Sequence, residues 1–243
     1  MTIYAIGDIH GMAKQLKERL AAIRRHADAH DIEKPTVVFV GDYVDRGPDS
    51  KAVLDILSGP GMAGFEPQFL LGNHDAFFLS AVNGRSNSND IAVWLRHTGG
   101  AETLESYGGS FRRHGPYEFL RRTDEWLPPA HKAFLIGLRT SWRKDDLFFS
   151  HAGFDPSRPL EQQTPATLLY GDSDMFEYDE PWLAAKLRER MGALAVHGHW
   201  TETSGVQVWP HRIGIDTGAG FAAGRLTAVA IEENGAVEIL PWP

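Results

Sequence analysis

Side chains that bind metal ions follow short apolar runs at several points along this chain. Asp8 and His10 stand two residues apart, so both side chains point to the same side of an extended backbone. The same placement recurs at Asp42, Asn73, His151 and His199. These oxygen and nitrogen donors suit manganese, iron or zinc. One carboxylate, which we assign to Asp42, could bridge two ions roughly 3.5–4 Å apart, the spacing of two-metal phosphoester sites.

Composition narrows the classes of function. Lys and Arg total 24 against 32 for Asp and Glu, a net charge of -8, which disfavours binding of a nucleic-acid polymer. The chain has no cysteine, so thiolate zinc sites and cysteine nucleophiles are excluded. The opening MTIYAIGD lacks the features of a signal peptide, and no apolar run approaches about 18 residues. We therefore expect a cytoplasmic protein with no membrane partner; its oligomeric state stays open.

The first third of the chain alternates strand and helix patterns. Apolar runs at 3–6, 36–40 and 69–71 each end in glycine followed by a polar residue. Helical patterns at 12–30 and 51–57 lie between them. Such alternation predicts a parallel sheet with crossover helices, whose ligands gather at the carboxyl edge of the strands. The polar residues after the three glycines should therefore meet at one edge.

The rest of the chain predicts a helical insertion and a second sheet. The polar segment 83–90 and the glycine-containing segment that follows favour a helical insertion around 83–125, serving as a lid or substrate wall. Further strands are expected at 147–150, 193–196, 206–209, 213–215, 226–231 and 237–240, with a helix at 180–191. Without repeats or linkers, the chain is expected to be one α/β domain, 1–243, with two sheets and helices outside.

Three ordered motifs carry a resemblance to a known family. They are GDIHG (7–11), GDYVDRG (41–47) and GNHD (72–75), followed by His151 in SHAG and His199 in HGHW. This set resembles the calcineurin-like metallophosphoesterases, and among them the bacterial serine/threonine phosphoprotein phosphatases, over residues 7 to about 226. The resemblance implies a double β-sheet sandwich flanked by helices.

The resemblance also implies a binuclear metal centre. Its two divalent or mixed-valence ions would be manganese in vitro, with iron or zinc as alternatives. The first ion would be held by Asp8, His10 and Asp42. The second would be held by Asp42, Asn73, His151 and His199. His197 falls outside the ligand position of the family, so we expect a strand-end histidine beside the site.

Three further residues match positions that act on the phosphate. His74 and Asp45 match the family's general-acid pair, and Arg46 matches its phosphate-binding arginine. A guanidinium offers a planar fork of hydrogen bonds to two phosphoryl oxygens. His74, held protonated by Asp45, would protonate the leaving oxygen. Two cations would activate a water for direct attack on phosphorus, without a covalent enzyme intermediate.

The sequence departs from the phosphatase pattern at two points, one of which is Leu71 before GNHD, where some bacterial members have arginine. Many phosphatases of this kind carry a second phosphate-binding arginine where this chain has Gly171 and Asp172. Arg158, Arg96 or Arg112 could replace it from a loop, but each is expected to be a surface charge. The motifs YGD, GNHD and GHW also resemble the symmetrical diadenosine tetraphosphate hydrolases.

Three functions therefore stay open. The favoured prediction is a phosphatase of phosphoproteins or small phosphomonoesters, because Asp45 is retained and 94–108 resembles a segment of bacterial phosphatases. The alternative is hydrolysis of dinucleoside polyphosphates. A non-catalytic scaffold ranks last, since every ligand and the acid pair are present. The remaining histidines are expected at surface or loop positions: His26, His30, His97, His114, His131 and His211.

Overall fold

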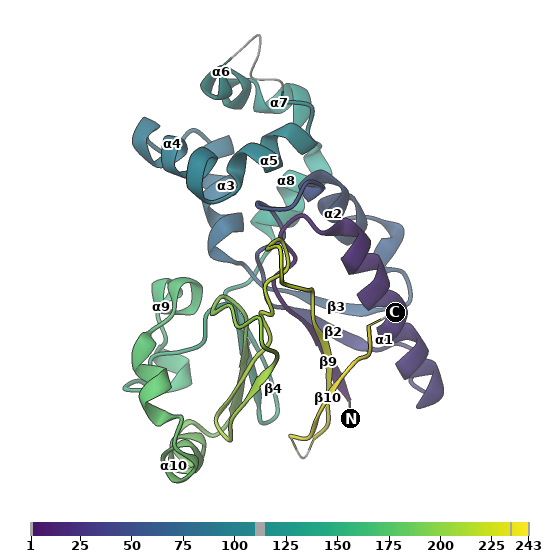
Figure 1. Ribbon diagram of the computed structural model, residues 1–243, viewed down its shortest axis with the longest axis vertical. Helices are drawn as coiled ribbons and strands as arrows, with labels where there is room; N and C mark the ends of the chain where they lie inside the picture. Colours follow the sequence, from purple (N-terminus) through teal and green to yellow (C-terminus); the bar gives the residue numbers. More distant parts are fainter. Residues whose placement is uncertain (1, 110–114, 234, 243) are drawn as a thin grey trace.

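Two five-stranded β-sheets form the centre of the protein, seen in a computed structural model that describes residues 2–109, 115–233 and 235–242 (Figure 1). The first sheet has the order β10-β9-β1-β2-β3. Strands β1 (Ile3–Ile6), β2 (Thr36–Phe39) and β3 (Glu66–Phe69) are parallel. Strands β9 (Ala228–Ile231) and β10 (Val237–Ile239) complete it in antiparallel pairing. The predicted parallel sheet is thus confirmed for the first three strands.

The second sheet has the order β4-β5-β6-β8-β7. Its parallel centre consists of β5 (Leu147–Ser150), β6 (Leu194–His197) and β8 (Arg212–Gly214). The edge strands β4 (Ser141–Lys144) and β7 (Gln207–Val208) pair antiparallel with their neighbours.

Alternating side chains along β1 divide the core into two layers. Ile3 and Ala5 pack between the sheets, in a cluster that includes Phe149 of β5. Tyr4 and Ile6 face the opposite way and pack with residues such as Leu16. Because this strand is buried on both faces, its sequence is apolar throughout instead of alternating with polar residues.

Helices cover the outer face of each sheet (Figure 1). Helices α1 (Ala13–Ala29) and α2 (Ser50–Leu57) lie on the side of the first sheet. Helices α9 (Pro165–Tyr170) and α10 (Pro181–Met191) lie on the side of the second, joined by the 3-10 helix η3 (Ser173–Tyr178). Within the described residues, no helix is both long and apolar enough to cross a membrane.

A group of helices, here called the cap, stands at one end of the molecule (Figure 1). Its members are α3 (Asn73–Val82), α4 (Ser88–His97), α5 (Gly100–Ser106), α6 (Pro116–Arg121), α7 (Thr123–Trp126) and α8 (Pro129–Ile136). The predicted helical insertion is present but longer than expected, since helical structure runs from α3 through α8. Two short 3-10 helices, η1 (Pro60–Met62) and η2 (Leu160–Gln162), lie elsewhere.

One strand lies at other residues than the sequence predicted, and another was not predicted. The third strand was expected at 69–71, whereas β3 ends at Phe69. Strand β4 was not predicted at all. Both are sheet edges with partly exposed, polar sequences, EPQF and SWRK, so neither shows the apolar run that marks a buried strand.

Two histidines expected at the surface are buried. The His131 ring lies between the Tyr107 hydroxyl, 2.8 Å from Nδ1, and the Asp55 carboxylate, 3.0 Å from Nε2. The His211 ring lies 3.3 Å from the Met175 carbonyl oxygen. Hydrogen-bond partners from distant segments make burial of these polar rings acceptable, and single-sequence patterns do not reveal such partners. His114 lies outside the described residues.

Candidate metal centre

The candidate ligands converge at the carboxyl edge of both sheets. Asp8 and Asp42 follow β1 and β2, and His151 and His199 follow β5 and β6. Asn73 is the first residue of α3. Of seven non-glycine residues with positive φ in the described part of the chain, five belong to this site: His10, Asp42, Asp45, Arg46 and His199. Left-handed backbone costs free energy in such residues, and it concentrates where a site must be held in one geometry.

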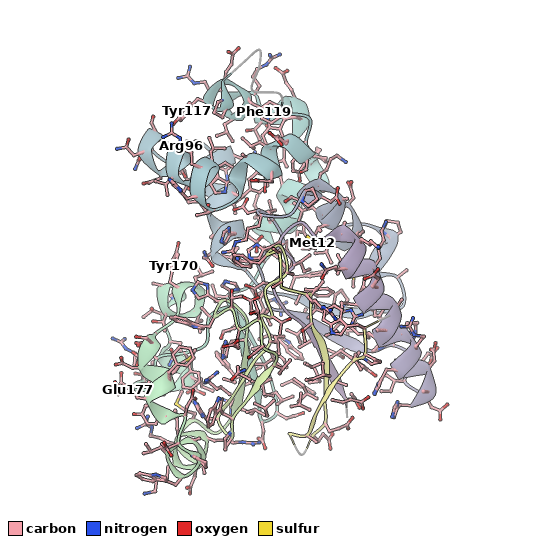
Figure 2. The ribbon with its side chains drawn as sticks, in the orientation of Figure 1. Met12, Arg96, Tyr117, Phe119, Tyr170 and Glu177 are labelled. Carbon is pink, nitrogen blue, oxygen red and sulfur yellow. The ribbon has the colours of Figure 1, made fainter. Side chains whose placement is uncertain are left out.

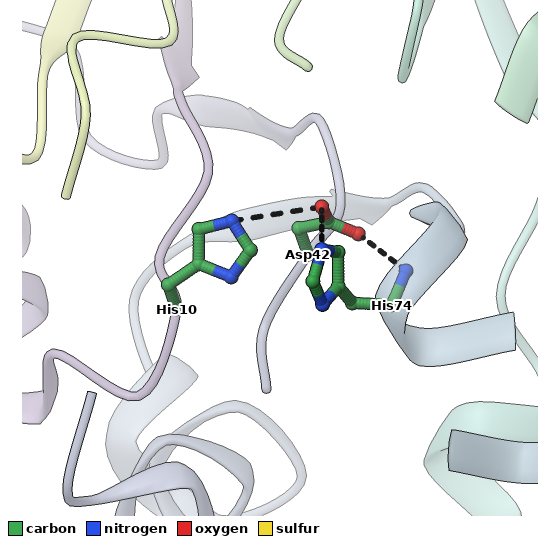
Figure 3. A group of neighbouring side chains, drawn as sticks. All are labelled: His10, Asp42 and His74. Atoms are coloured by element: carbon green, nitrogen blue, oxygen red, sulfur yellow. Dashed lines mark hydrogen bonds and ion pairs between the residues drawn. The ribbon is translucent and has the colours of Figure 1, made fainter. Parts of the chain in front are cut away.

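Asp42 lies at the middle of the group. Its Oδ2 atom is 3.6 Å from His10 Nε2 and 3.9 Å from His74 Nε2 (Figure 3). It also lies 3.5 Å from His151 Nε2. Two sets of potential ligand atoms, each within 4.8 Å of one another, share this carboxylate. One set adds His10 and His74, and the other adds Asp8 and His151. Asp42 is therefore placed where one carboxylate could reach two ions.

Two imidazoles are held in the tautomer that binds metal. His10 Nδ1 donates to the Val44 carbonyl at 2.9 Å, and His151 Nδ1 donates to the Val40 carbonyl at 2.9 Å. Each Nε2 atom is thereby left unprotonated toward Asp42. Burial lowers the pKa of His10 to about 3, so this ring is neutral at physiological pH.

Asn73 joins the remaining candidates. Its Oδ1 atom lies 2.8 Å from His151 Nε2 and 3.0 Å from His199 Nδ1. The backbone N–H of His199 in turn donates to the Asp8 carboxylate at 3.1 Å. All six predicted ligands therefore lie in one connected group, although their segments are far apart in the sequence.

The electrostatics of the group fit a bound cation. Asp8 is buried, and burial raises its pKa well above the usual range. The negative charges of Asp216 and Asp42 raise this pKa further. Carboxylates crowded together in a dry site are unfavourable unless positive charge is supplied. With imidazoles and an amide oxygen beside them, the donor set suits divalent transition metals.

The predicted acid pair and arginine lie at the same place. His74 Nδ1 is 2.7 Å from Asp45 Oδ2. Burial alone would lower the pKa of His74, but the Asp42 and Asp45 carboxylates outweigh this effect, and the pKa is raised. The Arg46 guanidinium lies 2.9 Å from His10 Nε2 and 3.4 Å from His74 Nε2.

The cap holds Asp45 through two residues that the sequence did not single out. Trp94 Nε1 donates to Asp45 Oδ2 at 2.8 Å, and Thr103 Oγ1 donates to Asp45 Oδ1 at 2.6 Å. Together with His74, these groups fix the carboxylate on both oxygens. The segment 94–108 was noted for its resemblance to bacterial phosphatases, but these two residues carry no spacing signal, so the sequence did not show that they contact Asp45.

Like Trp94 and Thr103, Asp75 was given no role from the sequence, yet it supports the site. Its carboxylate accepts the backbone N–H groups of Asp42 at 2.8 Å, Tyr43 at 2.9 Å and Gly72 at 3.1 Å. These bonds hold the left-handed backbone at Asp42. Its presence in the motif GNHD was the available signal.

Two glycines permit the close approach of the carboxylates. A Cβ atom on Gly72 would lie 2.0 Å from Asp42 Oδ1, and one on Gly198 would lie 1.9 Å from Asp8 Oδ1. No side chain fits at either position, which gives a physical reason for glycine beside these residues.

Three other residues considered from the sequence are not among the proposed ligands. His197 Nδ1 lies 2.9 Å from the Gly198 carbonyl, and the residue belongs to neither ligand set. Arg158 pairs with Asp155 at 3.0 Å, and Arg96 is exposed on the cap (Figure 2). Arg112 lies outside the described residues. Arg96 and Arg158 are thus placed as surface charges, as expected from the sequence.

Comparison with known proteins decides the family. A family model described as calcineurin-like phosphoesterase matches residues 1–236. The chain belongs to this family. It is therefore a metal-dependent phosphoester hydrolase, and members of the family use two divalent metal ions. The scaffold alternative is thereby set aside.

Similar proteins match over nearly their whole length. A relative from Janthinobacterium sp. (strain Marseille) is 26% identical, covering 98% of this chain and 96% of its own, and is named "Bis(5'-nucleosyl)-tetraphosphatase, symmetrical". A relative of the same name from Coxiella burnetii (strain CbuG_Q212) is 25% identical, with coverages of 98% and 91%.

Solved structures share the fold. One that is provisionally named as a diadenosine tetraphosphatase has a TM-score of 0.64 and 24% identity, covering 100% of this chain and 94% of its own. A cold-active protein tyrosine phosphatase has a TM-score of 0.61 and 16% identity, with coverages of 99% and 79%. These likenesses support the predicted double-sheet architecture.

Proposed function

We propose that this phosphoesterase cleaves dinucleoside tetraphosphates symmetrically into two nucleoside diphosphates. The observation that carries the proposal is the nearly full-length match to relatives named as symmetrical tetraphosphatases. The sequence alone favoured a protein phosphatase and gave this activity as the alternative. The relatives favour the alternative.

The surroundings of Gly171 support an anhydride substrate. Gly171 has φ +78°, and a Cβ atom there would lie 2.5 Å from the Trp200 indole, so an arginine could not take its place. A terminal phosphate ester carries nearly two negative charges, which a second arginine would help to hold. An internal phosphate of a polyphosphate chain carries only one. Arg46 beside the metal centre is therefore better matched to the internal phosphate.

We assign the metal ligands as the sequence predicted, although the two sets of nearby ligand atoms place His10 with His74 and Asp8 with His151. Asp8, His10 and Asp42 would hold one ion, and Asn73, His151 and His199 would hold the other. Asp42 would reach both. When bound, the two ions acidify water and offset the charge of the phosphoryl oxygens.

The remaining roles belong to protein side chains. Arg46 would hold two oxygens of the phosphate under attack with its planar guanidinium. As the oxygen of water bonds to phosphorus, the bridging P–O bond breaks. His74 Nε2 would give its proton to the departing oxygen, while Asp45 keeps the imidazolium in place through Nδ1. The second nucleoside diphosphate then leaves.

A panel of three substrates tests the proposed function. On diadenosine tetraphosphate with Mn²⁺ added, we expect ADP as the only nucleotide product. We also expect a kcat/KM at least about tenfold above that for p-nitrophenyl phosphate or a phosphoserine peptide, because binding of the nucleosides adds to transition-state stabilisation. A higher kcat/KM on the peptide would overturn the proposal and restore the protein phosphatase.

Replacing His74 by asparagine tests the proton donor. We expect kcat to fall about a hundredfold or more on phenyl phosphate, whose leaving group needs a proton, and much less on p-nitrophenyl phosphate. Metal content, measured by elemental analysis, should not change. The control is His97→Asn, an exposed histidine on the cap. Equal losses on both esters would contradict a role in protonation.

A further inference from the structure

A cavity lies directly beside the metal centre. It has a volume of about 340 Å³ and extends over the outer face of β6, β8 and β7. Trp200 and Thr201, which follow His199 in the chain, line its inner side. The Trp200 ring is 5.3 Å from the His199 ring, measured between centroids. The cavity is therefore next to the proposed phosphate site, and no candidate metal ligand lines it.

Flat groups make up much of its wall. The Phe176 ring meets the Trp200 ring at a centroid distance of 5.0 Å, nearly perpendicular. The Arg212 guanidinium lies 4.7 Å from the centroid of the Phe176 ring. Glu177, the residue after Phe176 in η3, points away from the protein and does not line the cavity (Figure 2). Aromatic rings and guanidinium planes of this kind stack on nucleobases.

The charges of the cavity do not favour a second phosphate. Arg212 is its cation, and both its Nε and Nη2 atoms donate to the Asp179 carboxylate. Glu202, another lining residue, adds a negative charge. A phosphate bound here would lack a compensating positive charge, which is unfavourable. A flat uncharged group needs no such compensation.

The polar atoms of the cavity are mainly acceptors. Gln207 Nε2 donates to the Gly205 carbonyl at 3.2 Å, which leaves Oε1 to accept. Glu202, also in the wall, contributes a carboxylate, which can only accept. Acceptors pair with the amino group that adenine, guanine and cytosine carry and uracil lacks.

We propose that this cavity binds one nucleobase of the dinucleoside substrate and prefers a base with an exocyclic amino group. The inference rests on the proposed function and names the recognition element that function requires. Trp200 separates the base from the phosphates. The ribose and one phosphate would span the short distance around it, from Phe176 to the metal centre.

Phe176→Ala tests the stacking contact, with Val208→Ala on the exposed side of β7 as the matched control. For Phe176→Ala we expect KM for diadenosine tetraphosphate to rise about tenfold while kcat stays within about twofold. KM for p-nitrophenyl phosphate, which has no base, should not change. An unchanged KM for diadenosine tetraphosphate, or an equal rise for both substrates, would overturn the proposal.

Equilibrium binding separates this inference from the proposed function. By calorimetry with Mn²⁺ present, the wild-type protein should bind ADP about tenfold more tightly than pyrophosphate, and Phe176→Ala should remove the difference. This result would support the cavity even if diadenosine tetraphosphate were not cleaved. Equal affinities in the wild type, or a preference that survives in Phe176→Ala, would overturn it even if cleavage occurred.

Gln207→Leu tests the choice of base. The wild-type protein should prefer diadenosine over diuridine tetraphosphate by about tenfold in kcat/KM, because uracil offers no amino group to Gln207 Oε1. The variant should lose most of this preference. A wild-type protein that treats the two substrates equally would contradict recognition of the amino group.

Discussion

Asp42→Asn should remove metal and activity together. We expect kcat on diadenosine tetraphosphate to fall by at least about a thousandfold, since charge stabilisation by the ions is worth several kcal/mol. The variant keeps the size and the left-handed backbone preference of the original residue. It removes the negative charge that lies 3.5–3.9 Å from the Nε2 atoms of three histidines. Elemental analysis and kinetics on the same preparation would measure both losses.

Asp145, another aspartate with left-handed backbone, provides the matched control. Asp145 has φ 51° and is exposed, away from the site. Asp145→Asn should leave metal content and kcat unchanged. Two ions still bound in Asp42→Asn, with full activity, would contradict the bridging role of Asp42. Retained metal with lost activity would instead limit that residue to positioning His74, whose backbone N–H donates to Asp42 Oδ1 at 2.9 Å.

Sequence predicted the interior of the fold better than its edges. Strands β1 and β2 are buried on both faces, so their apolar runs stand out from the surrounding sequence. Strands β3 and β4 lie at sheet edges and contain charged and polar residues. Their pairing depends on neighbours that are distant along the chain, and local hydropathy does not record such neighbours.

The residues of the candidate site also fall into a group that the sequence predicted and a group that it did not. Residues placed directly after buried strands, such as Asp8 and His151, were predictable because parallel strands bring their ends to one edge. Trp94 and Thr103 reach Asp45 from the cap, which follows no simple periodicity. The groups that would act on substrate could thus be read from motifs. Those that hold them in place required three-dimensional contacts.

Asp75→Asn should reduce both stability and metal affinity. Both oxygens of the buried Asp75 carboxylate accept backbone N–H groups, whereas an asparagine would turn an NH₂ group toward at least one of these donors. A buried N–H donor left without an acceptor costs about 1–3 kcal/mol, so the free energy of unfolding should fall by roughly 2–4 kcal/mol. Denaturant unfolding would measure this loss. The control is Asp124→Asn, a highly exposed aspartate of α7 for which we expect a change within about 0.5 kcal/mol.

Asp75→Asn also tests whether the hydrogen bonds that hold the backbone around Asp42 contribute to metal affinity. Asp75 does not belong to either set of potential ligand atoms, so its effect on metal would pass through the loop that it binds and through its charge, which interacts with that of Asp42. Loss of such a supporting contact typically lowers metal affinity about 10–100-fold. We expect a drop of this size in Mn²⁺ affinity, measured by titration at a temperature where the variant is fully folded. Unchanged affinity with reduced stability would mean that Asp75 serves the fold alone, and that the other contacts of Asp42 suffice to place its carboxylate.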